Sequence, residues 1–386
     1  MKIDKVNVYK IFLPFTGDFS ISRKKGSSAN NIVVEVVADK GEIKGYGEGA
    51  PIRFVTGETQ EGTAKSASRF VQKNSFPWKL DNVSQIWDFI DSLPKGKESN
   101  AAICAIEIAL LDALGKSQKK FILDYFSKDF YTGAVYYGAA IPLGNKSRIM
   151  ELCELIRKLR INQLRIKMDK NFEQNKEAVE IVNLVFGDDY DLRIDPNGVW
   201  DRNLAFKHVP LIKKYKVKIV EEPMSYLDPG FIEFVELMKS YGVILMACET
   251  VCTLEDLERI IKDDYYNMTN VKLCRSGGFR RSLKMIKRIR SSGLSFQIGC
   301  TLGESGILSA AGRALSLLCR DAVYHDGSYD RFMLKENITT EDVSFGPGGK
   351  AGPLDSPGLG VKINKESLMH LSNGSPSLTI SNPLSP

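Results

Sequence analysis

The sequence predicts an α/β protein, a modified (β/α)8 barrel with an N-terminal α+β capping domain. Five short apolar runs each end in charge or in Cys-Glu, and they lie at 164–167, 192–195, 217–221, 243–249 and 268–272. These runs recur about every 25 residues, roughly the length of one strand, one helix and two short turns. The chain has 386 residues, which leaves room for a smaller domain beside a barrel of roughly 250 residues.

The first part of the chain, residues 1–130, is expected to form the capping domain. Strand patterns lie at 3–9, 31–38 and 42–46, and helical patterns lie at 58–73, 82–92 and 99–116. The last helical segment is apolar on most faces, so we expect it to be buried. The segment at 15–26 is polar and contains glycine, and a loop of this length in a compact domain is usually a lid or mobile.

The glycine-rich segment at 45–49, Gly-Tyr-Gly-Glu-Gly, could be mistaken for a dinucleotide-binding loop. It follows a predicted strand, but Pro51 and a second loop stand where a helix should begin. The structural context that this fingerprint requires is therefore missing, and we expect no dinucleotide site here.

The barrel is expected at 131–329, with its first strand near 134–140. Its helices are expected at 146–160, 173–186, 203–215, 229–241, 253–263, 279–292 and 305–319. Residues 336–362 are rich in Gly and Pro, so we expect the segment 330–370 to return in extended form to the capping domain. The final residues, 371–386, are expected to be a disordered tail.

Charge at the carboxyl ends of parallel strands indicates a site, because these ends open on one face of a barrel. Asp195, Glu221 and Glu249 end three successive runs, and converging carboxylates repel one another unless a hard divalent cation neutralises them. We therefore expect one Mg²⁺ ion. Lys167 and Lys272 would flank it from opposite sides, where the metal charge and partial burial lower an ammonium pKa toward the working range. Two opposed lysines across a metal-bound carboxylate predict the movement of a proton at carbon.

Four motifs at these strand ends carry a resemblance to a known family. They are Arg165-Ile166-Lys167, Asp195-Pro196-Asn197-Gly198, Val220-Glu221-Glu222-Pro223 and Asn270-Val271-Lys272. In order and spacing they resemble the enolase superfamily, and within it the muconate-lactonizing branch that includes the dipeptide epimerases. The resemblance implies that Lys167 and Lys272 are catalytic and that Asp195 and Glu221 bind the metal. It also implies that Arg165, a lysine in the family, steadies the developing negative charge.

Two strand ends depart from the family pattern. Cys248-Glu249-Thr250 stands where the lysine-dyad branch usually has Asp-Glu-Ser. We expect Glu249 as the third ligand, and Cys248 as a thiolate ligand to a softer metal is the alternative. His325-Asp326-Gly327 stands where dipeptide epimerases have an Asp-x-Asp that holds the substrate ammonium group. Asp326 is then the carboxylate left to bind substrate there.

The resemblance adds two further candidates for contact with the substrate. Arg23, in the predicted lid, stands about where dipeptide epimerases place a cation that meets an acidic substrate side chain, although it could also belong to a solvated face. Asn197 would orient a lysine or lie just behind the metal ligands.

We expect one lysine to remove a proton alpha to a carboxylate and the other to return a proton on the opposite face. This reaction epimerises or racemises a small carboxylate, with a dipeptide as the first choice. The same first step leaves open a lyase of the o-succinylbenzoate synthase, muconate-type cycloisomerase or sugar-acid dehydratase kind. Arg165 and Cys248, which replace a lysine and an aspartate of the family, also leave open a catalytically silent barrel.

The bulk composition argues against several other classes of protein. The net charge is +6, with 53 basic and 47 acidic residues interspersed, which falls short of a nucleic-acid footprint. Seven cysteines without a repeated Cys-x-x-Cys pair indicate a reducing compartment. Residues 1–12 lack the apolar core of a secretory signal, and no apolar run approaches the roughly 18 residues of a membrane span. We expect a cytoplasmic homo-oligomer that binds neither nucleic acid nor membrane.

Overall fold

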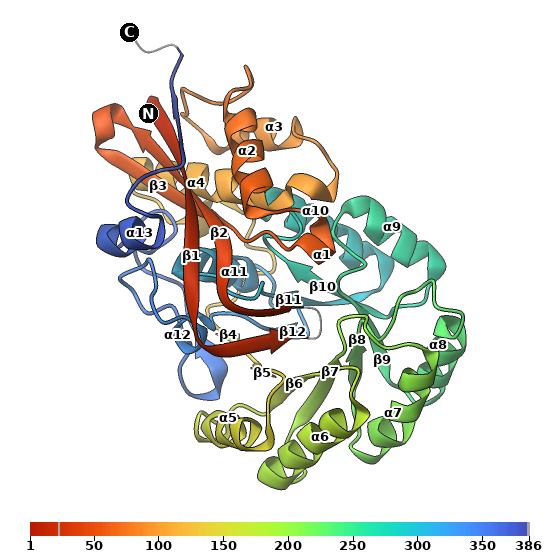
Figure 1. Cartoon of the computed structure of the whole chain (residues 1–386). Coiled ribbons are helices and arrows are strands. Elements are labelled where there is room, and N and C mark those ends of the chain that lie inside the picture. Colours follow the sequence, from red (N-terminus) through yellow and green to blue (C-terminus); the bar gives the residue numbers. More distant parts are fainter. Residues whose placement is uncertain (22–23, 384–386) are drawn as a thin grey trace.

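The computed structural model describes residues 1–21 and 24–383, with the backbone alone described at 18–21 and 24–25. Figure 1 shows a cap, built from the first part of the chain and its last residues, above a larger body of strands and helices. The two chain ends lie near each other on the cap. The (β/α)8-type barrel with an N-terminal cap is confirmed.

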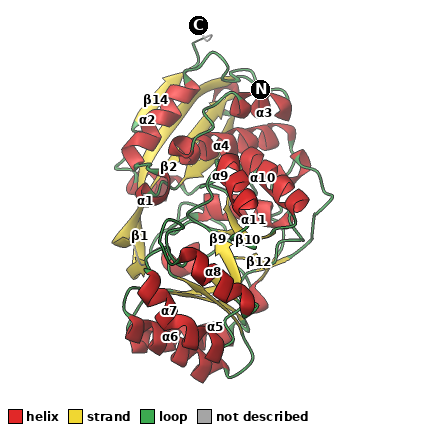
Figure 2. Ribbon diagram, turned by 90° about the vertical axis from the view of Figure 1, so that its right-hand side faces the viewer, coloured by secondary structure: helices red, strands yellow, loops and turns green. Residues whose placement is uncertain are grey.

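The cap is built on a four-stranded sheet in the order β14-β1-β2-β3, with all neighbours antiparallel. Its strands are β1 (Ile3–Ile21), β2 (Lys24–Ala38), β3 (Ile43–Gly49) and β14 (Leu378–Ser381). Its helices are α1 (Arg53–Thr56), α2 (Gln60–Val71), α3 (Val83–Asp91) and α4 (Asn100–Gln118). Figure 2 shows α2 and α4 lying along this sheet, and α4 is buried over most of its length, as its apolar faces predict.

Alternate glycines of β3 let α4 lie directly on the sheet. A Cβ at Gly45, Gly47 or Gly49 would stand 2.3, 2.1 or 2.3 Å from a carbonyl oxygen of the helix. The oxygens belong to Ala109, Ala105 and Ala101, in that order. Because residues at a spacing of two share one face of a strand, the glycine-rich segment forms a flat packing surface for the helix.

The hairpin of β1 and β2 corrects one expectation. Residues 15–26, predicted to be a loop, largely continue the two strands, since Phe19 pairs with Gly26 and Ile21 with Lys24 after a register shift beyond Pro14. The ladder partner supplies backbone hydrogen bonds that override the weak strand pattern of a polar segment. Arg23, predicted to contact the substrate, lies outside the described residues.

Eight parallel strands form the barrel sheet, in the order β12-β11-β10-β9-β8-β7-β6-β5. They are β5 (Ala139–Ile141), β6 (Gln163–Lys167), β7 (Asp191–Asp195), β8 (Ile219–Glu221), β9 (Ile244–Ala247), β10 (Met268–Lys272), β11 (Ser295–Gly299) and β12 (Tyr324–His325). The barrel closes where the Gly138 N–H donates to the His325 carbonyl at 2.9 Å.

The barrel helices lie close to their expected positions. They are α5 (Lys146–Lys158), α6 (Phe172–Phe186), α7 (Arg202–Lys214), α8 (Phe231–Ser240), α9 (Leu254–Asp263), α10 (Phe279–Ser292), α11 (Gly306–Leu317) and the short α12 (Asp330–Met333). Two short strands, β4 (Val135–Tyr136) and β13 (Lys350–Ala351), pair antiparallel, and α13 (Lys365–Leu371) follows.

The prediction of a disordered tail at 371–386 is wrong for most of that segment. Strand β14 pairs with β1 from Leu378 opposite Val8 to Ser381 opposite Lys5, and the Asn382 side chain donates to the Ile3 carbonyl at 2.7 Å. The partner strand lies at the other end of the sequence, so the local composition of Ser, Pro and Asn gives no sign of the pairing.

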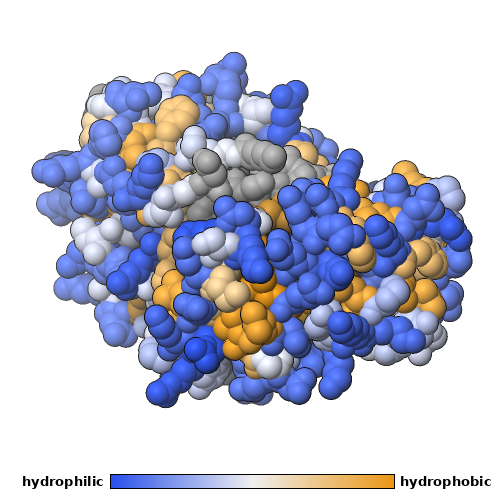
Figure 3. All heavy atoms as spheres, turned by 60° about the horizontal axis from the view of Figure 1, so that its bottom comes forward, coloured by the Kyte–Doolittle hydropathy of each residue, from blue (hydrophilic) through white to orange (hydrophobic). Residues whose placement is uncertain are grey.

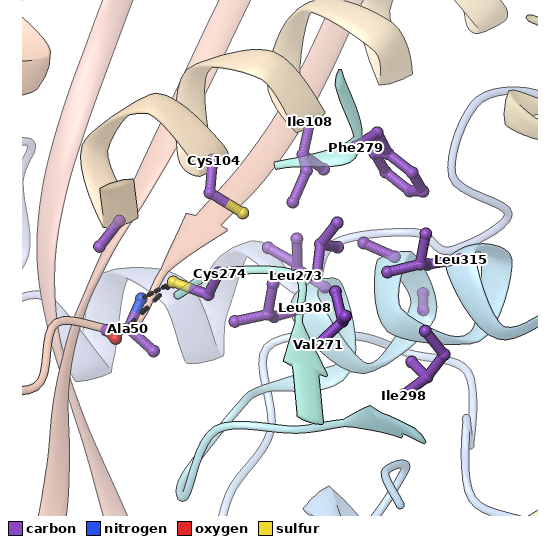
Figure 4. Packing of buried hydrophobic residues seen from close by; sticks show 14 of the residues in the cluster. Ala50, Cys104, Ile108, Val271, Leu273, Cys274, Phe279, Ile298, Leu308 and Leu315 are labelled. Atoms are coloured by element: carbon purple, nitrogen blue, oxygen red, sulfur yellow. Dashed lines mark hydrogen bonds between the residues drawn. The ribbon is translucent and has the colours of Figure 1, made fainter. Parts of the chain in front are cut away.

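Apolar packing joins the cap to the barrel beside the residues that follow β10. Figure 4 shows Cys104 and Ile108 of α4 above Leu273 and Cys274. The Ala50 N–H donates to the Cys274 sulfur at 3.1 Å, and the Cys274 thiol donates back to the Ala50 carbonyl at 3.7 Å. This contact fixes the backbone directly after Lys272.

Two buried carboxylates of the cap also hold the N-termini of barrel helices. Glu107 of α4 accepts hydrogen bonds from the first backbone N–H groups of α10, at Phe279 and Arg280. Glu48 of β3 accepts from the Ser305 and Leu308 N–H groups at the start of α11. The first backbone N–H groups of a helix have no partner within the helix and need acceptors from outside it, so these contacts join the cap to the barrel mouth.

The outer surface carries polar groups over most of the face drawn in Figure 3, with apolar atoms gathered near its lower centre. Across the described residues, the most exposed large apolar side chains include Leu184, Leu227 and Ile232, which are 73%, 76% and 55% exposed. No helix within 1–21 and 24–383 combines the length and apolar composition that a membrane-spanning segment needs.

A buried polar network holds the loop after β6. The Asn175 side chain both donates to the Asp169 carbonyl and accepts from its N–H, at 2.7 Å each. Asn175 also bonds to His208 Nε2 at 3.0 Å, and His208 Nδ1 lies 2.7 Å from the Leu204 carbonyl. The Trp200 ring stacks on His208 at 4.1 Å between centroids. Because the Leu204 carbonyl only accepts, Nδ1 carries the proton and Nε2 accepts from Asn175, which requires a neutral ring.

We predict that His208 makes the fold sensitive to acid. Burial lowers the pKa of His208 to about 4 from 6.5, so below pH 6.5 the unfolded chain binds the proton more readily than the folded chain. The contribution of neutral His208 to the free energy of unfolding is complete above pH 6.5. It declines between pH 6.5 and 4, by on the order of 3 kcal/mol.

Urea unfolding of the wild type and of His208→Gln across pH 4 to 7.5 tests this. The variant should be less stable at pH 7 but should lose less stability on acidification. The exposed His370→Gln is the control and should follow the wild type. Parallel pH profiles for His208→Gln and the wild type would contradict the prediction.

Candidate active site

The carboxyl ends of the barrel strands bring the predicted residues to one mouth. Arg165 and Lys167 lie on β6, Asp195 ends β7, Glu221 ends β8, Lys272 ends β10, and Glu249 and Asp326 follow β9 and β12. One cavity is lined by Arg165, Lys167, Asn197, Glu249 and Lys272. Asp195 and Glu221 lie behind them with no exposed surface.

Asn197 ties Lys167 to two of the carboxylates. The Lys167 ammonium donates to Asp195 Oδ2 and, at 3.2 Å, to Asn197 Oδ1. Asn197 adopts the left-handed backbone conformation, with φ of 52°. Its N–H then reaches Asp195 Oδ1, and its side-chain amide donates to Glu249 Oε1, both at 2.9 Å. The turn after β7 thus fixes the position of the lysine head.

Arg165 sits among three carboxylates. Its Nη1 lies 3.2 Å from Glu221 Oε2, 3.4 Å from Asp326 Oδ2 and 3.7 Å from Asp195 Oδ2. Burial disfavours the charged guanidinium, but the charges of Asp326 and Glu221 hold the pKa of Arg165 well above its ordinary value. Because arginine does not release its proton in proteins, this group is a fixed positive charge beside Lys167.

The opposite wall carries Lys272 and an arginine that the sequence analysis did not single out. Arg275 Nη1 donates to the Cys248 sulfur at 2.9 Å, and Nη2 donates to the Asn270 carbonyl. Burial opposes the charge on Lys272, but the carboxylates of Glu221 and Glu249 raise the pKa of this ammonium. With protein groups alone, Lys272 is therefore a cation rather than the lowered-pKa amine expected beside a metal ion.

The carboxylates at the mouth fit a hard divalent cation in number and kind of donor. Glu249 Oε2 is buried without a hydrogen-bond partner among the described residues. Burial, and then the charge of Glu221, raise the pKa of Asp195 to about 6, and such mutual repulsion is what a bound cation relieves. As the side chains stand, no three acidic, Cys or His groups in the described chain are gathered around one point, since Lys167 and Arg165 occupy oxygens of Asp195 and Glu221.

The thiol of Cys248, the alternative ligand, contacts Arg275 rather than the cavity. Burial raises the pKa of its thiol well above the ordinary value, against the smaller opposite effect of Arg275. The side chain has no exposed surface, and its sulfur accepts from the guanidinium. A neutral thiol is a poor metal ligand, because the thiolate is the form that coordinates.

Asp326 lies in the barrel interior rather than free at the rim. Its two oxygens accept from the Arg193 guanidinium at 2.9 and 3.1 Å, and Gln297 Nε2 adds a bond at 3.2 Å. Arg193 is fully buried and also lies 4.4 Å above the Tyr324 ring. His325, one residue earlier on β12, is absent from the cavity wall, and its Nδ1 has no hydrogen-bond partner among the described residues.

The cavity above the lysines is mainly apolar. Its wall includes Ile52, Phe54 and Val55 of the cap, Leu152, Leu155 and Leu159 of α5, and Tyr329, Phe332 and Met333 at α12. Arg148 of α5 is also at the wall. Arg193, Arg275 and the residues of α12 are not among the site residues that the sequence predicts. Arg193 was within reach of pattern reasoning, because it lies two positions before Asp195 and so shares its face of β7.

We predict that Asp326→Asn destabilises the fold. It leaves the buried Arg193 guanidinium without its counter-charge, and breaking one partner of a buried pair costs roughly 3–5 kcal/mol. Asp342→Asn, which breaks an exposed pair with Arg331, is the control and should cost about 1 kcal/mol or less. Urea unfolding measures both, and an equally small loss at the two positions would mean that Asp326 is not the counter-ion of Arg193.

Comparisons with known proteins identify the family of the chain. Residues 6–125 match the mandelate racemase / muconate lactonizing enzyme N-terminal domain, and residues 148–367 match the enolase C-terminal domain-like family. A hydrophobic dipeptide epimerase of Enterococcus faecalis is 26% identical over 375 residues, 96% of this chain and 97% of that protein.

Two solved structures share the fold. The N-succinyl Arg/Lys racemase from Bacillus cereus has a TM-score of 0.83 at 23% identity, over 98% of this chain and 99% of that one. The E. faecalis dipeptide epimerase complexed with Mg and the dipeptide L-Leu-L-Tyr has a TM-score of 0.81 at 24% identity, over 94% and 100%. The chain belongs to the mandelate racemase / muconate lactonizing enzyme family and is an isomerase of the enolase superfamily.

Proposed function

We propose that this enzyme inverts the configuration at the carbon alpha to the carboxylate of a small acylated amino acid, a class that includes dipeptides. The observation that carries the proposal is the placement of two lysines, Lys167 on β6 and Lys272 on β10, at the wall of one cavity with Asp195, Glu221 and Glu249 between their strands in sequence and in sheet order. An epimerase needs one group to take a proton and another to return it on the opposite face.

The oxygens of Asp195, Glu221 and Glu249 would hold one Mg²⁺ ion. When bound, such an ion supplies Lewis-acid stabilisation of negative charge on the substrate carboxylate. The Mg-containing dipeptide epimerase structure supports this assignment. Glu249 is the third ligand rather than Cys248, because Glu249 Oε2 has no partner among the described residues while the Cys248 sulfur accepts a hydrogen bond from Arg275.

The two proton transfers are assigned to lysines on opposite walls of the cavity. Lys167, held by Asp195 and Asn197, approaches the alpha carbon from the β6 side. Lys272, kept charged by Glu221 and Glu249, stands ready to donate a proton from the β10 side. Arg165 cannot exchange a proton under these conditions, and its fixed charge stabilises the negative charge that develops on the carboxylate as the alpha proton leaves.

The central test of this assignment is solvent exchange at the alpha carbon. In heavy water with Mg²⁺, the wild type should exchange the alpha hydrogen of N-acyl amino acids or dipeptides and invert the centre, as followed by proton NMR and polarimetry. Lys167→Ala and Lys272→Ala should each lose inversion by about a hundredfold or more, while each retains exchange of one configuration. Lys170→Ala, on the exposed loop after β6, is the matched control. An unsaturated product would indicate a lyase, and inversion by both lysine variants would overturn the assignment.

The metal assignment has its own test in direct binding. Glu249→Gln should weaken Mg²⁺ binding by about tenfold or more, because a charged oxygen ligand is lost. Cys248→Ser should leave Mg²⁺ binding within about twofold of the wild type. Calorimetric titration of the metal-stripped proteins measures both, independently of activity. A larger loss for the cysteine variant would transfer the ligand role to Cys248.

A further inference from the structure

Glu249 lies beyond the hydrogen-bonded part of its strand. Strand β9 ends at Ala247, and β8 and β9 lie side by side in the sheet (Figure 1). In the described part of the chain, no strand pairs with residues 248–250, although the Glu249 side chain lines the cavity. The backbone N–H groups of this turn therefore need acceptors from outside the sheet.

The Glu222 side chain supplies those acceptors. Its Oε2 accepts from the Cys248 N–H at 2.7 Å and from the Thr250 N–H at 3.2 Å. Its Oε1 accepts from the Thr250 hydroxyl, and from the Tyr266 hydroxyl at 3.3 Å. Glu222 is only 3% exposed, so these bonds are shielded from water. The two N–H groups flank Glu249, and one carboxylate thus holds the backbone on both sides of that residue.

The backbone of Glu222 connects the same turn to the loop after β7. Its N–H donates to the Met246 carbonyl at 2.9 Å, and its carbonyl accepts from the Gly198 N–H at 2.6 Å. Gly198 follows Asn197, whose side-chain amide donates to Glu249 Oε1 at 2.9 Å. Glu222 therefore links the carboxyl ends of β7, β8 and β9, the three strands that bring the proposed metal ligands to the mouth.

The backbone conformation of Glu222 is one that a residue with a Cβ rarely adopts. Its φ is 43°, in the left-handed region. Such strain persists only where the surrounding contacts fix it, and it is concentrated at functional sites. The two consecutive carboxylates at the end of β8 have different partners as a result. Glu221 contacts Arg165 and Asn270, whereas Glu222 contacts the turn after β9.

We propose that Glu222 is a positioning residue that fixes the place of Glu249 in the metal site. The inference rests on the proposed function, in which Glu249 is a ligand of Mg²⁺. Glu222 is not one of the described residues that line the cavity, so its effect passes through the backbone of 248–250. A ligand that is held in place before the metal binds loses less conformational entropy on binding.

Calorimetric titration of Mg²⁺ into the metal-stripped proteins tests this role. Glu222→Ala removes the acceptor of both N–H groups and should weaken Mg²⁺ binding by about tenfold or more, as expected when a group that orients a metal ligand is lost. Glu222→Gln keeps an oxygen for the two N–H groups, and its NH₂ can donate to the hydroxyls of Thr250 and Tyr266. This variant should bind Mg²⁺ within about threefold of the wild type. No loss in the alanine variant, or an equal loss in the glutamine variant, would overturn the proposal.

A double-mutant cycle separates positioning from a general loss of stability. If Glu222 acts through Glu249, Glu222→Ala should weaken Mg²⁺ binding by only about twofold or less in the Glu249→Gln background. Glu48→Ala is the matched control, because Glu48 is also a buried carboxylate that accepts from backbone N–H groups, at the start of α11. It should leave Mg²⁺ binding unchanged. Additive losses in the cycle, or an equal loss in Glu48→Ala, would indicate a structural role and overturn the proposal.

Hydrogen–deuterium exchange of the metal-free proteins reports on the turn without Mg²⁺ or substrate. Peptides that cover 245–253 should exchange at least about tenfold faster in Glu222→Ala than in the wild type, because two N–H groups lose their acceptor. Peptides from α4 should exchange as in the wild type. If Glu222→Ala does not fold, Thr250→Val takes its place, because it removes a hydroxyl that holds Glu222. It should weaken Mg²⁺ binding by at least about twofold, and unchanged binding would overturn the proposal.

The same titrations distinguish the positioning role from the metal assignment on which it rests. Normal Mg²⁺ binding by Glu249→Gln would contradict the metal assignment, and the positioning role would be overturned with it. Weak binding by Glu249→Gln together with normal binding by Glu222→Ala would overturn the positioning role and leave the metal assignment intact. Weak binding by both variants, with non-additive losses, is the result that we expect.

Discussion

Mutual neutralisation of buried charge is the constraint on which the mouth of this barrel depends. Asp195 and Glu221 have no exposed surface, and an isolated ion in such a place would lose its charge rather than remain ionised. The Arg165 guanidinium forms ion pairs with Glu221, Asp195 and Asp326. The Arg193 guanidinium forms a further ion pair with Asp326. Each buried charge is stabilised by the opposite charges beside it. The charged residues at the strand ends therefore depend on one another.

The cap is coupled to that unit through short connections. Glycines at alternate positions of β3 let α4 lie against the sheet, and α4 then delivers Glu107 to the start of α10 and Cys104 to the residues after Lys272. Glu48 makes the corresponding link to α11. The cap is thereby placed against the backbone that carries Lys272, and preorganisation of this kind is what the proposed proton transfer requires.

Local patterns in the sequence were sufficient to predict most of the strands and helices of the barrel. Four of the barrel strands, β6, β7, β8 and β10, end in a charged residue, and period-two alternation places Arg165 beside Lys167 and Arg193 beside Asp195. Long-range pairing was not accessible in the same way. The strands at 15–26 and 378–381 form because a partner strand supplies their backbone hydrogen bonds. The Asp326 carboxylate is held by the guanidinium of Arg193, which lies 133 residues earlier in the chain.

The pairing of β14 with β1 has a consequence for the order in which the molecule can be completed. Strand β1 is synthesised before the barrel, yet one of its edges pairs with residues 378–381, which are synthesised after the whole barrel. During synthesis the cap sheet therefore carries a bare edge beside a growing barrel, and exposed edges invite pairing with other chains. Strand β14 covers that edge, so a segment made after the barrel protects a strand made before it.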